Sequence, residues 1–335
     1  MAVIGSNNEQ GAYPTMVFQV SQTWACPVAM EAIVYVIGAG GSGCAIGGDQ
    51  DQAYNARGGA AGGCAVSRLS LAAQDYTVTI GSGGDDKNAS SVSEGEAGGN
   101  SVFSGTGIST MTGNGGAGGT GTNSAQNVTT GGGTATGGNL MNNTGGGGGA
   151  NTSANSVVSG GGGVNLYGSA AHGDGEAGTY AAGGSPIGIA GEVNSTSSGN
   201  HADSYYYPQT VERKDTPLSI NYFSSLMVHQ AGFNSVYDVD LSSNKRTNFP
   251  STVYSNTRQY VAVSSNSQQK GLYTQAGPFC GGAGYRASCS GASTSAQTGG
   301  VGAGGGACMN TSGSRTANSG CGGSGLIIIF PIQLG

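Results

Sequence analysis

Short apolar stretches near the two ends of the chain are its clearest structural signal. Ala32–Ile37 reads AIVYVI and ends at Gly38, and Leu326–Phe330 reads LIIIF with Pro331 behind it. Continuous β-branched and aromatic runs of this length, bounded by glycine or proline, predict buried strands. We expect these two strands to pair in a small sheet that closes the fold by joining both termini.

Three further stretches are predicted as strands. Met16–Val20 is apolar with weak alternation, whereas Val66–Leu71 and Tyr76–Ile80 alternate apolar with polar positions. Alternation with period two is typical of a strand with one buried face. Because only Ala-Ala-Gln-Asp separates the last two stretches, we expect them to form a β-hairpin.

Glycine dominates the chain between these predicted strands. It accounts for 68 of 335 residues, about a fifth, whereas the average glycine content of proteins is about 7%. It occurs in short runs, such as 145–149, 160–163 and 304–306, each followed by a polar, turn-rich stretch. Glycine inside ordinary helices or strands costs roughly 0.5–1 kcal/mol per residue. We therefore expect glycine to be the packing element. Polyproline II helices form no internal hydrogen bonds, so side by side they satisfy one another's backbone groups, and only glycine fits between them.

The predicted fold class is mostly irregular and all-β. We expect a glycine-rich polyproline-II helix sandwich, closed by a small β-sheet from both termini and carrying a β-rich insertion. Residues 1–15 are predicted to be a leader or attachment segment, and residues 16–200 and 276–335 the glycine-rich sandwich domain.

Residues 201–275 depart from the glycine-rich style. They contain only Gly232 and Gly271 as glycines, together with most of the basic residues and many aromatic ones. We interpret this block as an aromatic-rich insertion with its own small core. Its predicted strands are Ser219–Phe223, Ser235–Leu241 and Gln259–Ser264.

Charge is scarce along the chain, at 8% of residues, with a net charge of -6 and a pI of about 4.9. An excess of acidic over basic residues argues against a nucleic-acid-binding protein. The strongest apolar run is far too short to span a bilayer, and the first residues lack the pattern of a secretory signal. We expect a protein made in the cytosol, with no membrane insertion.

Three motifs suggest ligands, and each is incomplete. Gly38, Gly40 and Gly43 fit a dinucleotide fingerprint, but the following sequence is too broken by glycine for the helix that such a site requires. Asp238 and Asp240 have the spacing of a calcium loop without its glycine and terminal glutamate, so surface acids are the preferred interpretation. The seven cysteines form no C-x-x-C pair, which disfavours zinc. We interpret them as small buried thiols, with disulfides left open, and expect no cofactor.

No catalytic constellation stands out, and we expect no enzyme. The histidines His172, His201 and His229 lie in no nucleophile motif. Glycosidase chemistry needs only two placed carboxylates, so the acids of the aromatic-rich insertion carry no specific signal. These acids are Asp203, Glu212, Asp215, Asp238 and Asp240.

Five segments occur in a characteristic order: MVFQVSQTWACPVAMEAIVYVIGAGGSG, VSRLSLAAQDYTVTIGSGG, GGNSVFSG, TGNGGAGG and GGSGLIIIFPI. This order, over residues 16–121 and 320–332, resembles the glycine-rich domain of bacteriophage tail and tail-fibre proteins. It is also similar to the adhesins at the tips of long tail fibres, whose core is a polyproline-II sandwich. The insertion at 201–275 departs from that pattern.

The resemblance implies a bacteriophage tail-fibre tip adhesin, a receptor-binding protein located on the virion after synthesis in the host cytoplasm. Its implied partners are other virion tail or fibre proteins and a bacterial surface receptor, either protein or glycan. Recognition loops favour tyrosine because it offers a large, rigid contact area. We therefore expect the receptor to be contacted by five tyrosines at the end of the slab opposite the terminal strands: Tyr205, Tyr206, Tyr207, Tyr167 and Tyr180.

Other classes stay open at this point. The main alternative is a purely structural virion adaptor or plug without receptor contact, in which the tyrosine-rich loops would be buried against partner chains. An ice-binding protein would present a flat, regular Thr/Ala face, against which the irregular loop lengths argue. A depolymerase would show facing carboxylates in a long groove.

Overall fold

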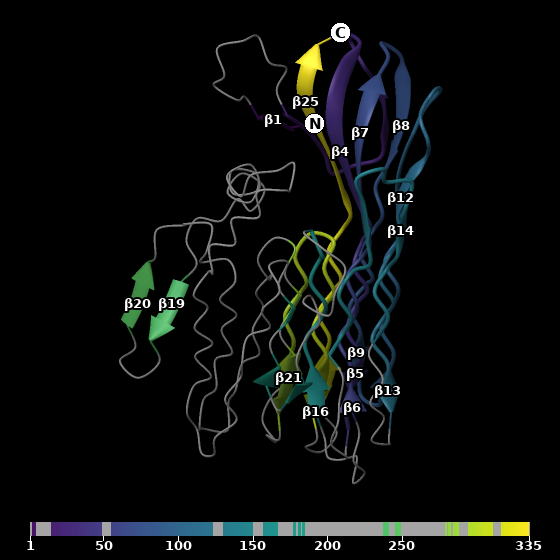
Figure 1. Cartoon of the computed structure of the whole chain (residues 1–335). Helices are drawn as coiled ribbons and strands as arrows, with labels where there is room; N and C mark the ends of the chain where they lie inside the picture. The colour runs from purple at the N-terminus through teal and green to yellow at the C-terminus, as the bar shows by residue number, and fades with distance from the viewer. Residues whose placement is uncertain are drawn as a thin grey trace.

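The computed structural model is all-β in the part of the chain that it describes. The described residues are 2–4, 15–48, 55–122, 130–149, 157–166, 177–178, 180–181, 183–184, 237–240, 245–248, 279, 281–282, 284–287, 294–310 and 316–334. Over these ranges no helix has the length and apolarity that a membrane span needs. Two packed sheets form one end of the molecule, and the glycine segments extend away from them (Figure 1).

A six-stranded antiparallel sheet joins the two ends of the chain. Its order is β1 (Ala2–Ile4), β2 (Thr15–Phe18), β25 (Leu326–Leu334), β4 (Met30–Ile37), β7 (Cys64–Leu71) and β15 (Met141–Asn143). The predicted pairing of the terminal strands is confirmed, because β25 lies between β2 and β4 with Ile328 opposite both Val17 and Tyr35. Both labelled ends of the chain lie beside this sheet (Figure 1).

A five-stranded antiparallel sheet packs against the first, in the order β14 (Ala135–Thr136), β12 (Met111–Gly113), β11 (Ser101–Ser104), β8 (Asp75–Thr79) and β3 (Gln22–Ala25). The predicted hairpin over residues 66–80 is wrong, because β7 and β8 belong to different sheets. Residues 72–74 cross between the sheets instead. The Ala72 amide donates to the Tyr76 hydroxyl at 2.9 Å, and the arch lets both strands bury their apolar faces in one core.

The core has one layer on each face of the six-stranded sheet. Between the two sheets, the rings of Tyr76 and Phe103 stack with centroids 5.3 Å apart, and Trp24 lies 5.7 Å from Tyr76. On the opposite face, Tyr35 packs in a second cluster with Leu166 and other apolar residues. Burial on both faces explains why β4 and β25 read as continuous apolar runs rather than alternating ones.

The glycine segments are bonded to one another through their backbones. From Gly38 to Cys44, the backbone amides donate in rotation to three antiparallel neighbours, so that every third amide meets the same neighbour. These neighbours are residues 57–63, 96–99 and 320–323. The runs at 145–149 and 160–163 also bond to each other, with the Gly146 amide 2.9 Å from the Gly163 carbonyl oxygen.

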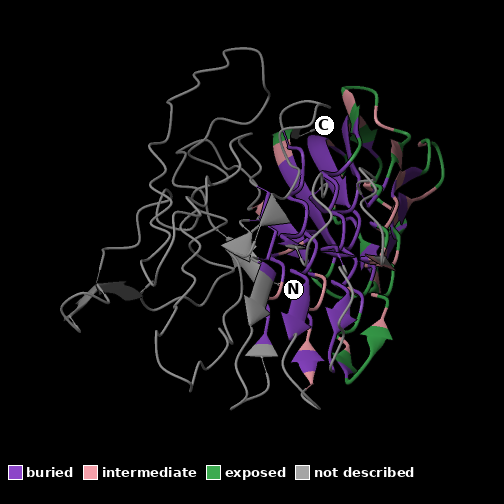
Figure 2. Cartoon of the chain, turned by 90° about the horizontal axis from the view of Figure 1, so that it is seen from below, coloured by how far each residue is buried: buried purple, intermediate pink, exposed green. Residues whose placement is uncertain are grey.

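Glycine is required where these backbones meet. A Cβ atom built on Gly40 would lie 1.9 Å from the carbonyl oxygen of Ala303, and one on Gly41 would lie 2.2 Å from that of Ala117. Real Cβ atoms do not approach backbone so closely. The prediction that glycine is the packing element is therefore confirmed. Buried residues run through the interior of the described part, and exposed residues lie mainly along one of its sides, in green in Figure 2.

Short strands occupy the end of the molecule opposite the two large sheets, here called the outer end (Figure 1). A second five-stranded sheet has the order β10 (Val92–Ser93), β5 (Ala45–Ile46), β23 (Cys308–Asn310), β21 (Gly284–Ala287) and β18 (Tyr180–Ala181). A four-stranded sheet contains β13 (Gly121–Thr122), β6 (Asn55–Ala56), β16 (Val157–Ser159) and β17 (Ala177–Gly178). A three-stranded sheet contains β22 (Thr294–Ser295), β24 (Ala317–Asn318) and β9 (Asn88–Ala89).

Part of the predicted insertion is described as a separate antiparallel pair. Strand β19 (Tyr237–Asp240) pairs with β20 (Lys245–Asn248). The strand β19 lies within the stretch 235–241 that the sequence predicts to be extended. The other two strands predicted for the insertion lie outside the described residues.

Candidate functional site

Most of the predicted receptor-binding tyrosines fall outside the described residues. Tyr167 and the cluster Tyr205–Tyr207 are among these, and their location stays a prediction. Tyr180 is placed in β18, where its backbone lies opposite Tyr285 of β21 in the second five-stranded sheet. This sheet belongs to the outer end, where the sequence predicts receptor contact.

The best described feature of the outer end is the turn between β9 and β10. Asn88, Ser90, Ser91 and Val92 are exposed there, and Val92 has 36% of its surface accessible. All four side chains are uncharged. The turn itself is therefore neutral, and exposed Asp85, Asp86 and Glu94 flank it.

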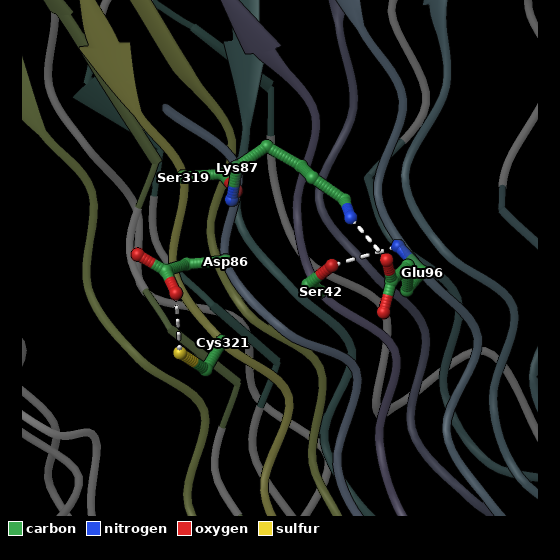
Figure 3. Close-up of polar contacts among 6 residues, drawn as sticks. All are labelled: Ser42, Asp86, Lys87, Glu96, Ser319 and Cys321. Atoms are coloured by element: carbon green, nitrogen blue, oxygen red, sulfur yellow. Dashed lines mark hydrogen bonds and ion pairs between the residues drawn. The ribbon is translucent and has the colours of Figure 1, made fainter. Parts of the chain in front are cut away.

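A polar cluster fixes the segment that carries this turn (Figure 3). The hydroxyl of buried Ser42 accepts a hydrogen bond from the Glu96 amide at 2.8 Å, and the Ser42 amide donates to the Glu96 carbonyl oxygen at 2.9 Å. The amide of Lys87 donates to the Ser319 hydroxyl at 2.9 Å. These contacts anchor both arms of the β9–β10 turn to the hydrogen-bonded glycine segments, here called the glycine lattice. In the sequence, Ser42 is a single hydroxyl residue within a run of glycine and alanine. Its role becomes clear only when the structure places it beside Glu96.

One ion pair and one hydrogen bond from a thiol to a carboxylate lie within this cluster. The Lys87 ammonium forms an ion pair with the Glu96 carboxylate, and this hydrogen bond and charge lower the pKa of Glu96. The Cys321 thiol donates to Asp86 at 3.5 Å, and burial raises the pKa of that thiol. A protonated thiol held by a carboxylate is a poor nucleophile. The cluster therefore positions backbone rather than performing covalent chemistry.

Four of the five cysteines that the structure describes are buried thiols. Cys26, Cys44, Cys64 and Cys308 form no disulfide and are buried, which confirms the interpretation for these four, whereas Cys321 forms no disulfide but is only half-buried. Burial raises the pKa values of Cys44 and Cys64 to about 12. Cys280 and Cys289 lie outside the described residues.

The dinucleotide fingerprint at Gly38–Gly43 is part of the glycine lattice. Each of its backbone amides already donates to a carbonyl oxygen of another segment, beginning with Gly38 to Gly63 at 2.9 Å. A phosphate-binding loop needs free amides that point at the ligand. This segment has none to offer, so the fingerprint is a consequence of glycine content.

The remaining candidate residues do not gather into a site. Asp238 and Asp240 are placed on β19, with their backbones opposite Thr247 and Lys245 rather than in a loop. Among the side chains that the structure describes, no group of three or more His, Cys, Asp or Glu is placed to hold a metal ion. The three histidines, Asp203, Glu212 and Asp215 lie outside the described residues.

The comparison with known families fits this geometry. A family model described as a glycine-rich domain matches residues 17–217, which is more than half of the chain. The chain belongs to the glycine-rich domain family. No curated protein matches this glycine-rich domain protein. The matched region includes the central segment Gly38–Cys44 and most of its bonded neighbours.

Proposed function

We propose that this glycine-rich domain protein is a bacteriophage tail-fibre tip adhesin that recognises a bacterial surface receptor through polar loops on a rigid scaffold. The observation that carries the proposal is the separation of the two ends. Both terminal strands pair in the six-stranded sheet, whereas the uncharged β9–β10 turn lies at the outer end (Figure 1). A rigid framework with exposed loops at one end suits recognition of a variable surface.

We also infer that the scaffold is a sandwich of left-handed polyproline II helices. The rotation of hydrogen bonds among three neighbours supports this, since such a helix has three residues per turn and leaves its own backbone groups free. An experimental structure is expected to give dihedral angles near φ −75° and ψ +145° in these segments. Angles in the α region over 145–149 or 160–163 would contradict it.

The expected partners differ between the two ends of the molecule. At the outer end, the partner is a bacterial protein or glycan bound by tyrosines and neutral polar groups, with no hydrolysis of host polysaccharide. At the end with the two large sheets, the partner is another virion protein. A purely structural adaptor would contact the virion protein but not a bacterial receptor.

Adsorption to host cells tests the proposal. Labelled purified protein is expected to bind host cells saturably, with little dependence on salt, and to compete with phage adsorption. Alanine at all of Tyr205–Tyr207 is expected to reduce binding at least 30-fold, because aromatic anchors each contribute about 2 kcal/mol or more. Phenylalanine at the same positions keeps the ring area and serves as the control. Absence of binding by the unmodified protein would contradict the adhesin, and normal binding by the folded alanine variant would remove these tyrosines from the site.

Ice binding is a second candidate, because hydroxyl side chains align on the five-stranded sheet that contains β3 and β8. Thr23 lies opposite Thr77, and Thr77 lies opposite Ser104 on the next strand. Thr23 and Thr77 are exposed. Thermal hysteresis of the purified protein would support this candidate, and freezing behaviour equal to that of a buffer control would remove it.

A further inference from the structure

Asn114 is the only asparagine of the sequence that is followed by glycine, although 68 of 335 residues are glycine. Asparagine is a thermally labile residue, and it is most labile before glycine. The reason is that glycine has no Cβ atom to shield its backbone nitrogen, which attacks the asparagine side chain. The dipeptide Asn114–Gly115 is therefore the position at which the chain is most open to spontaneous deamidation.

Deamidation at this dipeptide needs two reacting groups, the backbone nitrogen of Gly115 and the side-chain carbonyl carbon of Asn114. The nitrogen loses its proton to solvent and bonds to the carbon, and the side-chain nitrogen takes a proton from solvent and leaves as ammonia. Water then opens the resulting succinimide ring by adding across one of its two C–N bonds. The products are aspartate and isoaspartate, and no electrons are gained or lost overall.

Hydrogen bonds occupy both reacting groups in the folded chain. The Gly115 amide donates to the Asn100 side-chain oxygen at 2.9 Å, and the Asn114 side-chain amide donates to the Thr134 hydroxyl at 2.8 Å. The first bond holds the proton that the nitrogen must lose, and the second fixes the side chain against a neighbouring segment. Since Asn100 and Thr134 are exposed and Asn114 is half-buried, burial from water alone does not protect the dipeptide.

The backbone around the dipeptide is held as well. The Asn114 amide donates to the Thr134 carbonyl oxygen at 2.8 Å, and the Asn114 carbonyl oxygen accepts from the Gly63 amide at 2.9 Å. The succinimide ring forces a ψ angle on Asn114 between the extended and helical regions that residues normally occupy, so these contacts must break. Gly115 itself is required, because a Cβ atom there would lie 1.9 Å from the Gly98 carbonyl oxygen.

We propose that Asn114–Gly115 is a latent deamidation site and that Asn100 and Thr134 are positioning residues that keep it closed. Isoaspartate would add one carbon atom to the backbone at residue 114 and displace the backbone hydrogen bonds of the segment 114–120. Reaction therefore requires local opening of the glycine lattice, and its rate follows the fraction of time for which this part of the lattice is open.

Accelerated ageing of the purified full-length protein tests the proposal. The protein is incubated in mildly alkaline buffer, and aspartate and isoaspartate at residue 114 are followed by peptide mapping with mass spectrometry. We expect the reaction to be at least about tenfold slower in the folded protein than in the urea-unfolded protein, because only the open state reacts.

Substitution of the two positioning residues tests their role. Asn100→Ala and Thr134→Val are each expected to raise the rate in the folded protein about fivefold, which corresponds to the loss of a hydrogen bond of about 1 kcal/mol. Asn139→Ala is the matched control. It removes another side-chain oxygen that accepts a backbone amide at 2.9 Å, that of Arg68, and is expected to leave the rate at residue 114 unchanged.

Urea midpoints of the three variants separate protection of the site from general destabilisation. Faster reaction of Asn100→Ala or Thr134→Val at a midpoint equal to that of Asn139→Ala supports the proposal, and either variant carries the comparison if the other fails to fold. Equal rates in folded and unfolded protein would overturn the closed site, as would an unfolded chain that does not react at residue 114. Rates in both variants no higher than in Asn139→Ala would show that the two side chains do not protect the dipeptide.

Discussion

Gly162 and Gly131 are both glycines, but their surroundings are opposite. They show how one added Cβ atom can be excluded at one position of this fold and accommodated at another. A Cβ atom on Gly162 would lie 2.0 Å from the carbonyl oxygen of Gly146, whereas nothing lies within 4 Å of one on Gly131. The obstructing atom belongs to the backbone of another segment, which is itself held by hydrogen bonds on other sides. A side chain at Gly162 therefore has no flexible neighbour that can yield.

Alanine at these two glycines is expected to have opposite effects. Gly162→Ala should lower the free energy of unfolding by about 3 kcal/mol or more, the upper range for overpacking, or prevent folding. Gly131→Ala should be neutral or stabilise by about 0.4–1 kcal/mol, because it restricts only the unfolded chain. Urea denaturation of both variants measures this, and equal midpoints would contradict glycine packing.

The buried thiols predict a loss of stability at alkaline pH. The pKa of Cys64 is about 12 in the folded chain and about 8.5 in an unfolded one. Between these values the folded state holds a proton that the unfolded state has lost, so stability is complete below pH 8.5 and falls as the pH rises toward 12. The slope reaches about 1.4 kcal/mol per pH unit for one thiol.

Comparison with Cys64→Ala isolates this contribution from other alkaline titrations. The free energy of unfolding is measured for both proteins from pH 8 to pH 11. The variant is expected to lose stability less steeply, although removal of the sulfur lowers its stability at every pH. Parallel curves would show that Cys64 ionises equally in both states.

At the scale of elements, strand β25 holds the six-stranded sheet together. It pairs with β2 on one side and β4 on the other, and its residues contribute to the cores on both faces. Deletion of residues 326–335 is therefore expected to abolish cooperative unfolding. Deletion of residues 2–4, which removes the edge strand β1, should leave a cooperative transition. Circular dichroism during thermal unfolding measures both, and a cooperative transition without β25 would contradict its central position.

The sequence predicts strands well where both faces are buried and poorly where pairing decides the sheet. Continuous apolar runs identify β4 and β25, because polar side chains are excluded from both their faces. Alternation in β7 and β8 identifies a buried face for each strand but not which partner covers it, so a hairpin was the wrong prediction. Strands β3 and β11 are too short to stand out, and their contribution becomes clear only through the contacts among Trp24, Tyr76 and Phe103.

At the scale of the whole molecule, the glycine segments hold the two ends of a long intervening segment close together. The Gly281 amide donates to the Gly184 carbonyl oxygen at 2.9 Å. The two ends of the segment 185–278 are therefore held by the lattice itself. Replacement of this segment by a short Gly-Ser linker is expected to keep the melting temperature within a few degrees while abolishing adsorption, because it removes Tyr205–Tyr207. A large fall in melting temperature would show that the segment is part of the fold.

The sequence predicts the general character of the candidate site better than its geometry. Low charge, buried thiols and the failure of the dinucleotide fingerprint all follow from composition and local context. The contact between Ser42 and Glu96 does not, because it joins residues 54 positions apart whose proximity depends on the arrangement of the glycine segments. The same arrangement decides where each loop emerges.

Cryo-electron microscopy of intact phage particles would show directly where this chain lies. We predict it at the tip of a tail fibre, with the end that carries the two large sheets against the neighbouring virion protein and the outer end facing away from the particle. A position within the tail, with the outer end covered by other chains, would contradict the adhesin and support a structural adaptor.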